Sequence, residues 1–118
     1  MDTPAAVTAL GALAQDTRLR AFRLLVERGP DGLPAGQLAA ALDVPPSSLT
    51  FHLQQLLHAG LVTQRRASRN LIYAADIAAM NGLLGFLTEN CCGQGGTGGV
   101  CDPALAGTAA VARKPTAA

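Results

Sequence analysis

The sequence predicts a mainly α-helical domain that carries one small β-hairpin, which is an α+β fold class. Apolar residues recur at helical spacing in several segments, and from Leu61 this spacing changes to a strand-like pattern. Aromatic residues make up only 3% of the chain, so Leu, Ala, Val and Ile must fill the core, which suits helices. At 118 residues the chain is long enough for a single hydrophobic core.

Two helices are expected before the first strong break. Residues 4–14 carry three apolar side chains at helical spacing, Val7, Leu10 and Leu13. Asp16 is suited to cap a second helix that begins at Thr17, because its carboxylate can accept hydrogen bonds from N–H groups of the first turn. Gly29-Pro30 ends this helix, since proline cannot continue it.

A second pair of helices follows, separated by a proline pair. The third helix is expected from about Pro34 to Leu42, with Pro34 near its first position. Ser47 or Ser48 is expected to cap the fourth helix, which runs to about Ala59.

A hairpin and a last helix complete the pattern. Residues 61–66 and 71–74 are predicted strands, joined by the polar link 67–70. The last helix is expected over about residues 76–90, with five apolar side chains, Ile77, Met80, Leu83, Leu84 and Leu87. A helix, a turn and a second helix followed by a β-hairpin is the order of a winged helix-turn-helix.

The fourth helix has an apolar face and a polar face. Its apolar stripe is expected to pack inward and consists of Leu49, Leu53, Leu56 and Leu57. The other positions offer mainly hydroxyl and amide groups, which suit the reading of base edges: Ser47, Ser48, Thr50, Phe51, His52 and Gln54. The net charge is only +1, so phosphate attraction must be local, and the hairpin supplies Arg65, Arg66 and Arg69.

Simpler interpretations of these residues stay open. A polar helix face is usually only solvated, and a winged helix can also serve protein contacts. Phe51 can touch a thymine methyl group or fold over the domain surface. His52, at the edge of the stripe, fits helix packing or phosphate binding better than metal binding.

All three cysteines lie in one short stretch, at Cys91, Cys92 and Cys101, around a glycine-rich segment. Thiolates are soft ligands, so such a cluster predicts a site for a thiophilic ion. Three thiolates without a fourth ligand suit trivalent arsenic or antimony, whereas structural zinc prefers four ligands. A water or Asp102 can complete a tetrahedron, so zinc, cadmium and lead stay open as alternatives.

The chain resembles the ArsR family of bacterial metal-responsive repressors over roughly residues 5–92. The resemblance rests on Asp-Thr-Arg-Leu-Arg at 16–20, Leu-Thr-Phe-His-Leu at 49–53 and His-Ala-Gly-Leu-Val at 58–62. It implies a homodimer that binds double-stranded operator DNA without the ion and releases it when the ion binds. The expected dimer interface combines apolar residues of the first and last helices, Val7, Leu10, Leu13, Ile77, Met80, Leu83, Leu84 and Leu87.

The chain also departs from this family. Several arsenic and cadmium sensors carry a Cys-x-Cys pair near the helix before the turn, but residues 37–42 contain no cysteine. Zinc and cobalt sensors use carboxylates and histidines of the last helix, where Asp76 stands alone. The cluster behind the last helix instead resembles that of a minority of arsenic-responsive members.

These observations predict three regions: a DNA-binding and dimerisation domain over residues 1–92, a metalloid-binding loop over 91–101 and a disordered tail over 103–118. The expected function is a repressor of an arsenical-resistance operon, with As(III) or Sb(III) as inducer and no constitutive cofactor. A thiol redox regulator is the alternative, disfavoured because the ionised neighbours of the cysteines, Glu89 and Asp102, are acidic.

The remaining function classes are disfavoured by what the sequence lacks. There is no Cys-x-x-Cys pair, so a thiol oxidoreductase, and enzymatic activity in general, is not expected. An odd cysteine count argues against a disulfide scaffold and favours the cytoplasm. No apolar run approaches the roughly 20 residues that cross a bilayer, so no membrane partner is expected.

Overall fold

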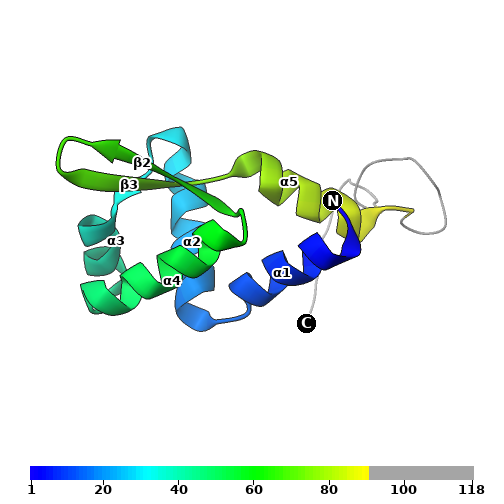
Figure 1. Cartoon of the computed structure of the whole chain (residues 1–118), viewed down its shortest axis with the longest axis horizontal. Coiled ribbons are helices and arrows are strands. Elements are labelled where there is room, and N and C mark those ends of the chain that lie inside the picture. Colours follow the sequence, from blue (N-terminus) through cyan, green and yellow to red (C-terminus); the bar gives the residue numbers. More distant parts are fainter. Residues whose placement is uncertain (91–118) are drawn as a thin grey trace, which may run out of the picture. The chain divides into compact units, whose positions relative to one another are not determined.

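The computed structural model describes residues 1–90 (Figure 1). Its elements are α1 (Thr3–Leu13), α2 (Asp16–Arg28), the 3-10 helix η1 (Gly29–Asp31), β1 (Leu33–Pro34), α3 (Ala35–Leu42), α4 (Pro46–His58), β2 (Val62–Ala67), β3 (Asn70–Ala75) and α5 (Ile77–Thr88). The chain divides into two compact units, Met1–Asn81 and Gly82–Ala118. The first unit contains all elements up to the start of α5, and it has the predicted mainly helical winged helix-turn-helix fold.

The sheet has three antiparallel strands in the order β1-β3-β2, one more than the predicted hairpin. The additional strand, β1, has two residues and pairs Leu33 with Tyr73 and Pro34 with Ile72. Two residues are too few to show an alternating pattern, and only the partner strand makes them a strand. Pro34 is also the cap position of α3, directly before the first helical residue Ala35, which agrees with its expected place near the helix start.

The start of α2 differs from the prediction. Asp16 is already the first helical residue, and Gln15 is the cap, since its side-chain oxygen accepts a hydrogen bond of 2.9 Å from the Arg18 N–H. The Asp16 carboxylate instead forms an ion pair of 3.1 Å with Arg20 one turn later. Both side chains are exposed, so this pair contributes little to stability.

The start of α4 also differs from the prediction. The helix begins at Pro46, and its cap position is Pro45, which has no side-chain cap. Proline suits a first helical position because its ring fixes φ and its missing N–H would have no partner there. Ser47 and Ser48 therefore lie within the first turn, exposed and not used as caps.

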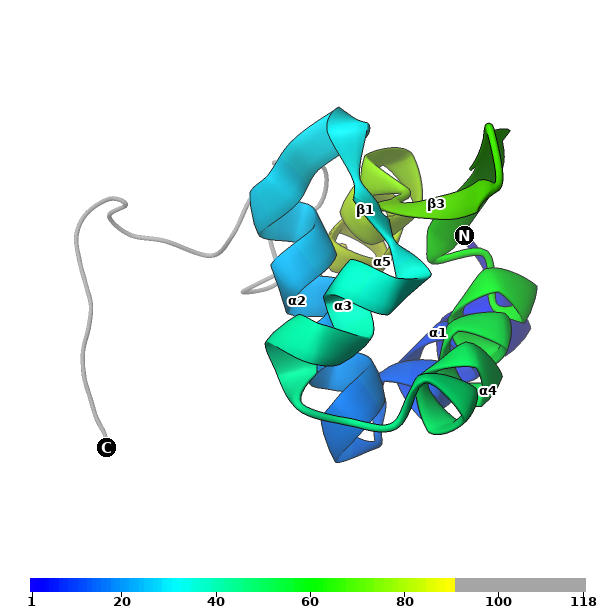
Figure 2. The same ribbon diagram turned by 90° about the vertical axis from the view of Figure 1, so that its left-hand side faces the viewer.

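The core lies where α2, α3, α4 and the sheet meet; Figure 2 shows α3 against α2 and β1. Its largest fully buried side chains are Leu25, Leu38, Leu49, Leu53, Leu56, Leu61 and Tyr73. The predicted inward stripe of α4 is confirmed for Leu49, Leu53 and Leu56, while Leu57 is only half-buried. The buried Tyr73 hydroxyl accepts a 2.7 Å hydrogen bond from Gln64, which satisfies its polar end.

Gly32 connects η1 to β1 with a φ of 66°, and a Cβ atom there would collide with the backbone carbonyl of Tyr73. We expect Gly32→Ala to lower the free energy of unfolding in urea. Gly29→Ala is the control, because Gly29 has a similar φ of 74° but no atom within 4 Å of its Cβ position. Backbone strain of about 1–3 kcal/mol is common to both variants. The collision should cost Gly32→Ala at least about 1 kcal/mol more, and equal losses would contradict this account.

Among residues 1–90, none of the helices is both long and apolar enough to cross a membrane.

Candidate nucleic-acid interface

The turn between α3 and α4 is built from the backbone. Asp43 ends α3 in the left-handed conformation, with a φ of 57°, and its N–H bonds back to carbonyls of the last turn. The N–H of Val44 adds a 3.1 Å bond to the Ala39 carbonyl, and Pro45 then directs the chain into α4. This short turn sets two helices at an angle, so that the second can present one face to a groove of DNA.

The outward face of α4 is polar and accessible. Five of the six predicted base-reading residues are exposed: Ser47, Ser48, Thr50, Phe51 and Gln54. The Thr50 hydroxyl donates to the Pro46 carbonyl at 2.9 Å, which leaves its oxygen lone pairs and its methyl group for a partner. Phe51 is 60% exposed, so it does not fold over the domain surface. An exposed aromatic ring among hydroxyl and amide groups can contact a thymine methyl group.

The sixth residue, His52, is directed differently. Its ring is half-buried, and its Nδ1 lies 3.2 Å from the Arg18 guanidinium of α2. Burial, and secondarily the positive charge of Arg18, lower the pKa of His52 below its usual value of 6.5. His52 is therefore neutral near pH 7 and serves packing of α4 against α2. The role of Arg18 leaves no signal in the sequence, because its partner His52 lies 34 positions away.

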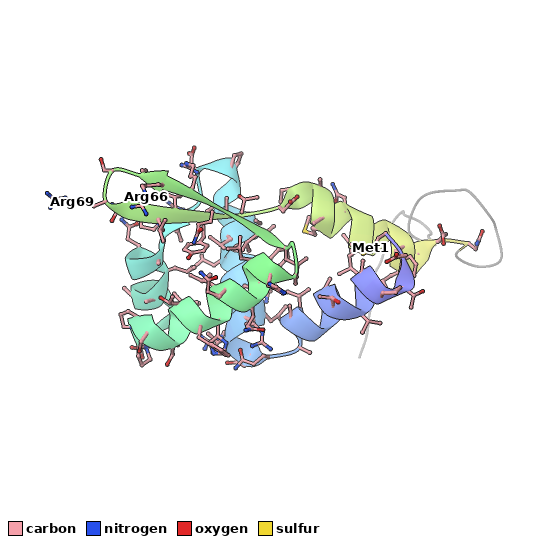
Figure 3. All side chains as sticks on the ribbon, in the orientation of Figure 1. Met1, Arg66 and Arg69 are labelled. Atoms are coloured by element: carbon pink, nitrogen blue, oxygen red, sulfur yellow. The ribbon has the colours of Figure 1, made fainter. Side chains whose placement is uncertain are left out.

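The three wing arginines do not form a single cluster. In the antiparallel register Arg65 pairs with Ile72 and Arg66 with Leu71, so these neighbours project to opposite faces of the hairpin. Arg65 also donates a 3.2 Å hydrogen bond to the Asp31 carbonyl, which ties it to the domain. Figure 3 shows Arg69 at the tip of the hairpin, pointing away from the body. We therefore expect Arg66 and Arg69, more than Arg65, to contact DNA phosphates.

This difference predicts unequal effects of alanine substitutions on DNA affinity. Arg66→Ala should weaken binding and flatten the slope of log K against log salt by about 0.9, the value for one lost phosphate contact. Arg65→Ala removes the same charge and is the matched control, with a smaller change of slope. Fluorescence anisotropy between 50 and 200 mM salt, roughly the range over which phosphate contacts dominate affinity, measures both. Equal changes would place Arg65 at the phosphates as well.

The predicted metal ligands Cys91, Cys92 and Cys101 lie outside the described residues. Within residues 1–90, no group of three or more His, Cys, Asp or Glu side chains is close enough together to hold a metal ion.

The predicted dimer residues are mostly accessible. In α1 the buried face consists of Ala6 and Ala9, which leaves Val7 and Leu10 exposed and Leu13 half-buried. At the start of α5, Ile77 is exposed and Met80 half-buried. In the second unit, Leu84 and Leu87 are 52% and 53% exposed, whereas Leu83 is only 5% exposed and offers little surface.

The hairpin and the α3–α4 turn lie at the same end of the domain (Figure 1), so a polar helix face and a basic wing are available together. This fold and this surface define a winged helix-turn-helix DNA-binding protein. Residues 13–65 match a family model described as a helix-turn-helix domain.

Three solved structures illustrate what the chain is similar to. An ArsR-like transcriptional regulator from Rhodococcus sp. RHA1 is 27% identical, with a TM-score of 0.63 over 71% of this chain and 76% of that one. HlyU from Vibrio cholerae is 31% identical, with a TM-score of 0.58 over 71% and 91%. The antimony-specific transcriptional repressor AntR is 32% identical, with a TM-score of 0.56 over 69% and 72%. No curated protein sequence matches the chain.

The chain belongs to the ArsR family of winged helix-turn-helix transcriptional regulators.

Proposed function

We propose that the protein is a homodimeric repressor that releases its operator when trivalent arsenic or antimony binds Cys91, Cys92 and Cys101. Release would allow transcription of a resistance operon. The observation that carries this proposal is the position of all three cysteines, directly behind a DNA-binding domain and within residues 91–101.

The chemistry of the cluster fits a pyramidal ion. Three thiolates occupy three positions around trivalent arsenic or antimony, and the lone pair of the ion takes the place of a fourth ligand. Closing the glycine-rich segment between Cys92 and Cys101 costs a few kcal/mol at most, because loop-closure entropy grows slowly with length. Bonds from three soft sulfurs to a soft ion can offset that cost. The similar protein AntR is described as an antimony-specific transcriptional repressor, which supports a metalloid as the ion.

In the proposed complex, α4 supplies sequence preference and the wing supplies affinity. Helix α4 has no Asp, Glu, Lys or Arg side chain, so its hydroxyl, amide and aromatic groups would discriminate bases in the major groove. Arg66 and Arg69 hold phosphates, which position the helix but carry no sequence information. Two copies related by two-fold symmetry would then contact half-sites about 34 Å apart.

The proposed switch acts through the dimer interface. The exposed Leu84 and Leu87 of α5 lie only a few residues before Cys91, so an ion bound at the cluster would act on the chain directly after the interface helix. A changed position of this helix would change the spacing of the two recognition helices. The ion shifts the equilibrium only by the difference between its affinities for the DNA-bound and released forms.

A titration of the DNA complex tests the proposal. The protein is bound to its own upstream DNA, and arsenite, antimonite, zinc, cadmium and hydrogen peroxide are added in separate gel-shift series. We expect arsenite or antimonite to release DNA at the lowest concentration, and zinc to act weakly for want of a fourth strong ligand. Release by zinc or cadmium first would instead indicate a divalent-metal sensor. Release by peroxide alone would indicate a thiol redox regulator, and absence of DNA binding would indicate a protein-binding winged helix.

A further inference from the structure

Arg18 connects three helices. It lies in the first turn of α2, where its backbone N–H is held by the Gln15 side chain. Its Nε donates a 2.6 Å hydrogen bond to the carbonyl of Ala12, in the last turn of α1. Its Nη1 lies 3.2 Å from Nδ1 of His52, in the middle of α4. One guanidinium therefore joins the end of α1 and the start of α2 to the recognition helix.

The chemistry of this bridge fixes the state of His52. A guanidinium has only donors, so Nδ1 of His52 must be the acceptor, and the imidazole carries its proton on Nε2. A protonated imidazole has no free lone pair and would bring a second positive charge against Arg18. The bridge therefore exists only with neutral His52, in agreement with the lowered pKa of this residue.

The bridge occupies a position where small movements matter for DNA reading. His52 is flanked in sequence by Phe51, whose ring meets the imidazole edge to face with centroids 5.6 Å apart. Phe51 is 60% exposed on the reading face of α4. A change in the orientation of His52 therefore reaches the aromatic ring that the proposed complex places in the major groove.

We propose that Arg18 is a positioning residue for DNA recognition, which holds α4 and Phe51 in register with α1 through a hydrogen bond to neutral His52. This inference rests on DNA binding by the family and is independent of the ion that releases the DNA. Two of the five guanidinium donors of Arg18 are directed to Ala12 and His52 within the protein, so the proposed role is positioning and not phosphate binding.

Protonation of His52 in acid should break its hydrogen bond with Arg18. A nearby carboxylate would offset the new positive charge, so the charged residues on the elements that pack against α4 matter here. Helix α4 packs against α1, α2, α3 and β2. Helices α1 and α3 contain no ionisable side chain, and the remaining charged residues on these elements are Asp16, Arg20, Arg23, Glu27, Arg28, Arg65 and Arg66. Of these, Asp16 is paired with Arg20, and Arg18 is the charged group that acts on His52. As the pH falls through the lowered pKa of His52, the added positive charge strengthens binding to random DNA, whereas loss of the bridge weakens operator reading.

Four variants test the bridge at neutral pH. Arg18→Ala and His52→Ala should each weaken operator binding about tenfold, the equivalent of one charge-assisted hydrogen bond, with little change on random DNA. His52→Asn should bind almost as well as wild type, because the Asn oxygen can replace Nδ1 as acceptor. The double variant Arg18→Ala/His52→Ala should be no weaker than either single variant. Arg23→Ala removes one exposed charge from the same helix and is the control.

The pH profile adds a readout that loss of stability would not produce. In a His58→Gln background, His52 is the only histidine. The ratio of operator to random-DNA affinity should fall as the pH drops through the lowered pKa of His52, and it should become independent of pH in this range when His52 is also replaced by Asn. Nitrogen NMR of the free protein should show His52 protonated on Nε2, and a raised pKa for His52 in Arg18→Ala.

Several results would overturn the proposal. Parallel losses on operator and random DNA in Arg18→Ala, with a flatter salt slope, would make Arg18 a phosphate contact. A proton on Nδ1 of His52 would contradict the bridge. A ratio of operator to random-DNA affinity that still depends on pH in His52→Asn would contradict it as well. If Arg18→Ala does not fold, the operator affinities of His52→Ala and His52→Asn decide the question by themselves. Equal losses in these two variants would then refute the bridge. Wild-type protein that binds no DNA would refute both this inference and the proposed function, whereas DNA binding that is equal in all variants would refute only this inference.

Discussion

Replacing Cys91 or Cys92 by serine should remove most of the arsenite response while leaving operator binding intact. Both residues follow the described domain, so their loss does not touch the reading face of α4. Removing one of three thiolates leaves a two-coordinate site for the ion. We expect the arsenite concentration for half-release to rise at least about tenfold, because loss of even an outer-shell partner of a metal ligand typically costs that much.

The remaining cysteine variants refine this prediction. Cys101→Ser should be the mildest if the adjacent pair dominates, and it should retain a response to a methylated arsenical that needs only two thiols. The measurement is DNA release by each variant across an arsenite titration, after confirming equal affinity without arsenite. A triple serine variant that still releases DNA normally would leave the DNA-binding function standing and exclude the cysteines as the sensor.

A charge in the proposed dimer interface should abolish operator binding. Leu84 is 52% exposed in the single chain, as expected for a side chain that a second copy covers. Leu84→Glu would place two carboxylates in an apolar interface, at a cost of several kcal/mol when they are unpaired. We expect monomers in sedimentation experiments and an operator affinity reduced at least about a hundredfold, since each half-site is then bound separately.

The control for this variant is a charge elsewhere on the same helix. Asn81 is exposed and polar, so Asn81→Glu should leave both assembly and DNA binding near wild type. A wild-type protein that sediments as a monomer at micromolar concentration and still binds its operator tightly would contradict the dimer. A dimeric Leu84→Glu variant would move the interface away from α5.

Local sequence determined most of the fold, because helical periodicity and proline breaks act over a few residues. The stripe Leu49, Leu53 and Leu56 predicted which face of α4 is buried, since apolar burial follows spacing alone. Helix starts were less predictable: Gln15 and Pro45, not Asp16 or a serine, occupy the cap positions of α2 and α4. Several neighbouring residues can each cap a helix, and packing selects among them.

The strand β1 and the individual roles of the wing arginines needed the tertiary structure. Leu33 and Pro34 form a strand only because β3 lies beside them, and Arg65 differs from Arg66 only through the register of the hairpin and the nearby Asp31 carbonyl. Hydrogen bonds between distant segments leave no periodic signal in the chain.

The sequence alone indicated the class of chemistry that two segments of the chain can support: a helix with hydroxyl and amide groups followed by a basic hairpin, and three cysteines after the last helix. Residue types and short spacings suffice for that, because they define which bonds a segment can form. Only the tertiary structure decided that His52 turns from the reading face toward Arg18, 34 positions away, and that Phe51 stays exposed. These orientations depend on how α1, α2 and α4 pack, and packing is a property of the whole domain and not of any one segment.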